Sequence, residues 1–142
     1  MMGNKGVRVA VVGADLFEAV SAIAGAIGLV VGFMNIPVTV LNGSPFSDFT
    51  VPALLLGAVV GGSALVSGAI TAFGPRQYGA PASALAGCVT VAWIVVEVAM
   101  IGLGSWLQVF YLLVGLLMIG LAWLLWRADT HTARVMGRRQ PA

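Results

Sequence analysis

The stretch WIVVEVAMIGLGSWLQVFY, residues 93–111, holds the end of one apolar run, a turn, and the start of another apolar run. The turn is Gly102-Leu103-Gly104-Ser105, because glycine adopts the backbone conformations that tight turns require. A carboxylate, Glu97, lies inside the first run, and an amide, Gln108, lies near the start of the second. The stretch therefore predicts a hairpin of two membrane-spanning helices with polar side chains at membrane depth.

The composition of the whole chain is that of a membrane protein. Of the 142 residues, 60% are hydrophobic and 8% are charged, whereas soluble domains carry about 25% charged residues. The length suits one domain, residues 1–142. One cysteine excludes an intrachain disulfide and one histidine excludes bis-histidine haem ligation, so we expect no cofactor and no metal. The sequence outside the tail contains no basic patch with interleaved aromatic residues, so it does not indicate nucleic-acid binding.

Four apolar runs are long enough to cross roughly 30 Å of hydrocarbon, which takes about 20 helical residues. The predicted spans are residues 16–36, 51–73, 81–102 and 105–126, with an outer loop at 37–50 and a tail at 127–142. The predicted fold class is an all-α, polytopic transmembrane four-helix bundle. The start of the first span stays open, because Val7–Gly13 is also apolar and would place Asp15 and Glu18 deeper in the membrane.

The basic residues predict the orientation of the chain. The first and third loops contain no basic residue. The basic residues lie at the N-terminus, in the second loop or at the C-terminus: Lys5, Arg8, Arg76, Arg127, Arg134, Arg138 and Arg139. Basic residues are enriched in cytoplasmic segments of membrane proteins. We therefore expect a multi-pass protein of the bacterial cytoplasmic (inner) membrane with both termini in the cytoplasm.

Glu97 is the most unusual residue of the hairpin, because it lies about 7 Å inside the hydrocarbon boundary on the predicted bounds. A bare carboxylate in the membrane interior costs about 2.5 kcal/mol or more. The predicted ligand- or proton-binding site is an outer-leaflet pocket of Glu97, Gln108, Trp93, Tyr111 and Asp48. The alternative is that Glu97 bonds Gln108 or a backbone group and holds the helices together.

Two further acids flank the inner end of the predicted first span. There Asp15 and Glu18 are expected to form an interfacial charge cluster with Arg76 and Arg127. The alternative is a proton relay from Glu18 to Glu97, which needs a water path.

Small residues at four-residue spacing allow close contact between membrane helices. They predict packing within the chain or, alternatively, contact with a membrane-protein partner or a second copy through glycine-rich faces: Gly25, Gly28, Gly32, Gly57 and Gly61. The lipid bilayer itself is the other expected partner.

Three segments carry a resemblance to known proteins: SPFSDFTVPALLL (44–56), WIVVEVAMIG (93–102) and SWLQVFYLLVG (105–115). Together they resemble a group of small four-span membrane proteins of high-GC Gram-positive bacteria. The resemblance implies the topology and supplies no catalytic residue. Glu18 also resembles the first-span glutamate of small multidrug-resistance transporters, but the one-sided basic residues and the third-span acid depart from that family.

The sequence leaves three hypotheses for function. The favoured one is a non-enzymatic accessory or scaffold protein that binds lipid or a membrane partner through the outer pocket around Glu97. The first alternative is a proton-coupled transporter or channel in which Glu97 titrates, although the inner halves of spans three and four offer only Ser83 and Thr90 as polar residues. The second is a membrane-lipid-modifying enzyme with Glu97 and Asp48 as acid and base.

Overall fold

The computed structural model describes residues 3–137, and within them the chain is entirely helical, with no strand. Four helices are long and apolar enough to cross a membrane, which confirms the all-helical class and the number of candidate spans. The elements are α1 (Asn4–Val30), η1 (Val38–Leu41), α2 (Thr50–Leu54), η2 (Leu55–Gly61), α3 (Gly62–Phe73), α4 (Arg76–Ile101) and α5 (Trp106–Gly137). Arg138 and Arg139, which belong to the basic residues used to predict the orientation, lie outside the described residues.

The helix of the first candidate span, α1, begins at Asn4 and ends at Val30, whereas the sequence predicted a span over residues 16–36. The apolar residues before Asp15 continue the helix, because no proline and no pair of glycines interrupts them. Val7, Val11 and Asp15 lie four residues apart and so share one buried face of α1. The helix has 27 residues and is about 40 Å long. Asp15 and Glu18 therefore lie near the middle of this helix.

The second span comprises α2, η2 and α3, which run without a break from Thr50 to Phe73. Its first turn is capped from the loop, where the Thr50 N–H donates a hydrogen bond of 2.8 Å to Asp48 Oδ1. This bond to the charged form lowers the pKa of Asp48. The middle segment, η2, is a π-helix that packs on α1, and a Cβ added to Gly61 would lie 2.9 Å from Ile23 Cγ1.

The third and fourth spans form the predicted hairpin. Gly102 ends α4 with φ 79°, a left-handed conformation that favours glycine. The two helices approach each other closely at Gly87 and Gly115, where a Cβ on Gly87 would lie 2.8 Å from the Gly115 carbonyl oxygen. Helix α5 then continues past residue 126, the predicted end of its span, to Gly137.

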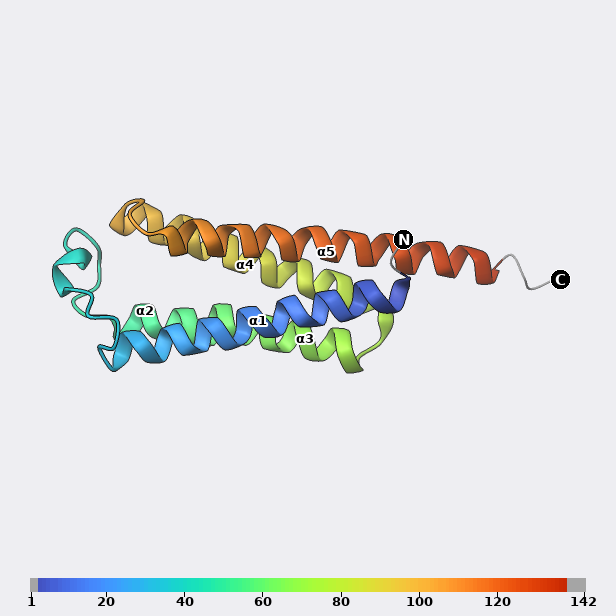
Figure 1. Ribbon diagram of the computed structural model, residues 1–142, viewed down its shortest axis with the longest axis horizontal. Helices are drawn as coiled ribbons and strands as arrows, with labels where there is room; N and C mark the ends of the chain where they lie inside the picture. Colours follow the sequence, from blue (N-terminus) through green and yellow to red (C-terminus); the bar gives the residue numbers. More distant parts are fainter. Residues whose placement is uncertain (1–2, 138–142) are drawn as a thin grey trace.

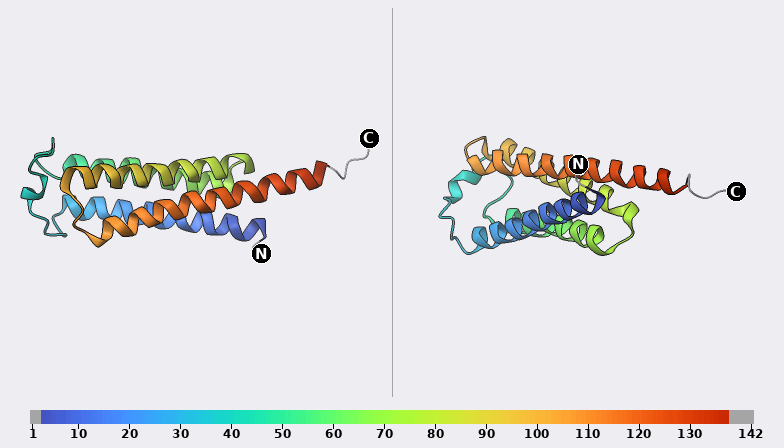
Figure 2. Two further views of the ribbon diagram at one scale, coloured as in Figure 1. Left: turned by 90° about the horizontal axis from the view of Figure 1, so that it is seen from above. Right: turned by 45° about the vertical axis from the view of Figure 1, so that its right-hand side comes forward.

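The four long helical segments lie roughly side by side (Figures 1 and 2). Helix α1 packs mainly against the second span and α5, and α4 packs mainly against α3 and α5, so that α1 and α4 are diagonal neighbours with little direct contact. The start of α1 and the last turns of α5 lie at one end, which we call the terminal end. The segment between α1 and α2, with η1, lies at the other end, which we call the loop end.

Replacing Gly87 by alanine should destabilise the protein by about 1–3 kcal/mol, because the new methyl group would collide with the α5 backbone. Gly120→Ala is the matched control, since nothing lies within 4 Å of a Cβ there. Thermal unfolding in detergent, followed by circular dichroism, measures both. Equal melting temperatures for the two variants would contradict the close contact.

Candidate functional site

Asp15 lies at the centre of the packed helices and is completely buried. Its Oδ2 accepts a hydrogen bond of 2.6 Å from Ser67 Oγ on α3, and its Oδ1 accepts one of 2.8 Å from Ser83 Oγ on α4. Both serines are buried as well. One carboxyl group thus joins three helices, including the diagonal pair α1 and α4.

Glu18 follows one helical turn later and is 1% exposed. Its Oε1 lies 3.2 Å from Thr90 Oγ1 on α4, and the same hydroxyl lies 3.1 Å from the Ala86 carbonyl oxygen. A hydroxyl has one hydrogen to donate, so it cannot fully satisfy both oxygens. A proton on Glu18 resolves this, because Glu18 then donates to Thr90 and Thr90 donates to Ala86.

The second oxygen of Glu18, Oε2, is buried and has no hydrogen-bond partner. Buried polar atoms are normally paired, and an unpaired one indicates strain, an unseen water or ion, or a functional role. Glu18 therefore keeps one buried oxygen without a hydrogen-bond partner near the middle of α1.

The predicted charge cluster of Asp15, Glu18, Arg76 and Arg127 does not form. Arg76 is exposed at the start of α4, and the Arg127 guanidinium lies 4.6 Å from the centroid of the Trp123 ring. In residues 3–137 the ion pair present joins Arg8 to Asp129, at 3.1 Å. The two acids therefore meet hydroxyl groups and no cation.

The other predicted site is centred on Gln108, which is 2% exposed. Its Nε2 donates to Glu97 Oε1 and to the Gly102 carbonyl, each at 3.2 Å. Its Oε1 accepts from the N–H groups of Gly104 and Ser105, at 3.1 and 3.3 Å. The structure thus brings Glu97 and Gln108 together, as the alternative to a ligand pocket predicted. The Gln108 amide closes the hairpin turn and caps α5.

The remaining residues of the predicted outer pocket do not converge on a ligand. Asp48 is exposed on the loop and bonds Thr50, and Tyr111 is half-buried on α5. Trp93, half-buried on α4, does join the group, because its side chain lies within hydrogen-bonding reach of the Glu97 carboxyl group. Tyr111 stacks edge-on against Phe110, at 5.4 Å between ring centroids.

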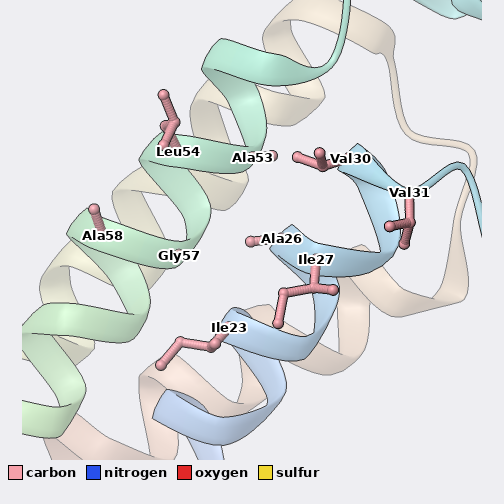
Figure 3. A pocket seen from close by; sticks show the side chains of 9 residues that line it. All are labelled: Ile23, Ala26, Ile27, Val30, Val31, Ala53, Leu54, Gly57 and Ala58. Atoms are coloured by element: carbon pink, nitrogen blue, oxygen red, sulfur yellow. The ribbon is translucent and has the colours of Figure 1, made fainter.

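An apolar groove lies elsewhere, between α1 and the start of the second span (Figure 3). It measures about 390 Å³ and is lined by Ile23, Ala26, Ile27, Val30, Val31, Ala53, Leu54, Gly57 and Ala58. A second hollow of about 370 Å³ lies against Asn35 and Phe49. Neither includes Glu97 or the central acids.

Several glycines of the predicted glycine-rich faces pack against other residues of the same chain. A Cβ on Gly57 would lie 3.0 Å from Ala26 Cβ, and one on Gly25 would lie 3.4 Å from Leu56 Cδ2. A Cβ on Gly28 would contact Met34, and Gly32 has φ 70° in the turn after α1. With Gly61 against Ile23, these contacts agree with packing inside the chain.

Sequence reasoning missed the grouping of Asp15 and Glu18 with their hydroxyl partners on other helices: Ser67, Ser83 and Thr90. A signal was present, since Ser67 and Thr71 lie four residues apart on α3, and Ser83 and Thr90 lie seven apart on α4. Each pair therefore marks one polar stripe on an apolar helix.

No family model, curated protein or solved structure matches this chain. The site is therefore interpreted from its own geometry.

Ser67→Ala should destabilise the protein by about 1–3 kcal/mol, because it leaves one buried oxygen of Asp15 without a donor. Ser63→Ala is the control on the same helix, since the Ser63 hydroxyl bonds only the local Val60 carbonyl. Chemical unfolding in detergent measures both. If the Asp15 bond matters, the loss should shrink when Ser67→Ala is made in an Asp15→Ala background.

Gln108→Leu should destabilise by a similar amount of about 1–3 kcal/mol, because two loop N–H groups and Glu97 lose their partner. Glu97→Gln keeps an oxygen that can accept from Gln108 and should cost less than about 1 kcal/mol. The same unfolding measurement compares them. A larger loss for Glu97→Gln would show that Glu97 does more than close the hairpin.

Proposed function

We propose that this protein is a small proton-coupled transporter or channel, and that Asp15 and Glu18 are its proton-binding site. The observation that supports the proposal is the burial of two carboxyl groups near the middle of an apolar helix, where their partners are hydroxyl groups and one oxygen is unpaired. Ionisable residues inside a membrane are costly and mark ion pathways and proton relays. The proton site of the earlier hypothesis thus moves from Glu97 to the first span.

The physical basis is the change in charge when a proton leaves. A neutral carboxyl group is tolerated among apolar helices, whereas an unpaired carboxylate there favours any conformation that admits water or a cation. Proton binding and release at Glu18 would therefore favour different packings of α1 against α4. This is the elementary step that couples a proton to a conformational change.

We further propose a four-helix bundle in the cytoplasmic membrane with both termini in the cytoplasm. The basic residues support this orientation, because the described ones gather at the terminal end: Lys5, Arg8, Arg76, Arg127 and Arg134. The segments at the loop end contain no basic residue.

A second candidate function is the accessory or scaffold role, now placed at the apolar groove of Figure 3 and not at Glu97. An open groove lined wholly by apolar residues suits a lipid acyl chain or a helix of a membrane partner. The lipid-modifying enzyme has less support, because Asp48 bonds Thr50 and Glu97 bonds Gln108.

Proton movement tests the main proposal. The full chain in proteoliposomes should carry protons down an imposed pH gradient, reported by a pH-sensitive dye inside the vesicles. Glu18→Gln should abolish this flux, because the amide cannot release a proton. Glu97→Gln is the matched control and should retain it, since Glu97 belongs to the hairpin turn.

Infrared spectroscopy supplies the readout when no solute is known. The carboxyl-stretch band that disappears in Glu18→Gln should change with pH in the wild-type protein. A correctly folded protein with no flux and a Glu18 band that never responds to pH would overturn the proposal and leave the scaffold role.

A further inference from the structure

Buried polar side chains continue from the two acids towards the terminal end. These residues, which we call the polar column, are Thr71, Ser67, Ser83, Asp15, Glu18 and Thr90, each of them at most 2% exposed. Ser67 and Ser83 contact Asp15, and Thr90 contacts Glu18. Thr71 lies one turn beyond Ser67, and its hydroxyl donates to the Gly79 carbonyl at 3.3 Å. The column thus runs between α1, α3 and α4.

The interior beyond Glu18 towards the loop end has a different chemistry. The side chains buried there are small or apolar: Ala22, Ala26, Ala53, Val60, Ile94 and Val114. They separate Glu18 from Gln108 at the hairpin turn. An apolar constriction excludes water and so blocks ions and protons.

A group of polar contacts covers the terminal end of the column. Arg8 donates to the Thr71 carbonyl at 2.8 Å and to Asp129 Oδ2 at 3.1 Å, and Asn4 donates to Asp129 Oδ1 at 2.8 Å. We call this group the Arg8 latch. It joins α1, α3 and α5, and it reaches α4 as well, because a Cβ on Gly79 would lie 3.3 Å from an Arg8 nitrogen.

The latch is suited to opening and closing. The side chains of Arg8 and Asp129 are 19% and 18% exposed, so water already reaches the pair from outside. Ion pairs with solvent access are weak. Thr71 is the first member of the column behind the latch and is bonded directly to it.

Few other charged groups face this path. Asp15 bonds Ser67 and Ser83, Glu18 bonds Thr90, and the second span from Thr50 to Phe73 has no titratable residue. On α4, Glu97 is bonded at the loop end, and the other titratable groups are exposed: Arg76, Tyr78 and Cys88. On α5, Asp129 belongs to the latch, and the other titratable groups near the terminal end are exposed: Arg127, His131 and Arg134.

We propose that in this packed conformation Glu18 exchanges its proton with water at the terminal end, through the polar column, and that the Arg8 latch is the gate of this path. The inference rests on the proposed proton function and adds its side of access and its gate. On this basis a proton enters past Arg8 and Thr71, reaches Asp15 and Glu18, and goes no further while the loop-end interior stays packed.

The test uses the full chain in proteoliposomes whose orientation is set by the accessibility of a C-terminal tag. The pH is changed rapidly on one side of the membrane, and the Glu18 carboxyl band is followed in time. The band should respond fast when the pH changes on the terminal side, and at least about tenfold more slowly, at the rate of proton flux, when it changes on the loop side. A response to the loop side that is equally fast would overturn the inference.

Variants of the latch test the gate. Arg8→Gln and Asp129→Asn should each speed the terminal-side response by about two- to fivefold, the effect of removing one partly exposed ion pair. Arg134→Gln is the matched control, because it removes an exposed basic residue on the same side. Unchanged rates in both single variants, with normal helix content, would overturn the gate.

The two proposals fail in different ways. A Glu18 band that does not respond to pH from either side removes the proton site itself and the path with it. A band that responds equally from both sides leaves the proton site in place and removes only the one-sided path.

Discussion

The two hydrogen bonds that Asp15 accepts, from Ser67 and Ser83, set the positions of three helices at once. Within lipid there is little hydrophobic force to drive helices together, so close packing and hydrogen bonds decide their register. Serine is a short side chain, and its hydroxyl reaches Asp15 only because the surrounding residues are small. Ala19, Ala64 and Ala86 form the buried core beside it. The small core and the buried acid therefore depend on each other.

The same arrangement divides the interior into two halves of different chemistry. From Thr71 to Thr90 the buried positions between α1, α3 and α4 include hydroxyl and carboxyl groups among alanines and valines, whereas alanine, valine and isoleucine occupy buried positions beyond Glu18. Polar groups reappear at the opposite end, where Gln108 satisfies the hairpin turn. Of the acids within the spans, Glu97 thus has a bonding role that its neighbours explain, and Glu18 has an oxygen that they do not.

The sequence predicted the all-helical class, the four candidate spans and the meeting of Glu97 with Gln108, because long apolar runs and a short glycine turn leave few alternatives. The predicted span over residues 16–36 differs from the helix Asn4–Val30, since the apolar residues after Val30 do not differ in kind from those inside the helix. On the predicted bounds Asp15 and Glu18 flank the span end beside arginines, whereas they lie near the middle of the helix. Their true partners lie more than fifty positions away in the chain, and nothing in a single sequence states which helices are diagonal neighbours.

Helix α5 is unbroken from Trp106 to Gly137 and makes hydrogen bonds to other segments near its start and in its last third. Gln108 holds the hairpin at one end, and Asp129 bonds Arg8 and Asn4 at the other. The distance between them along the helix is about 32 Å. Since a continuous helix tilts as a rigid rod, a tilt that lengthens the hydrogen bonds of Gln108 also shifts those of Asp129. The two ends of this small protein are thereby mechanically linked through one helix backbone.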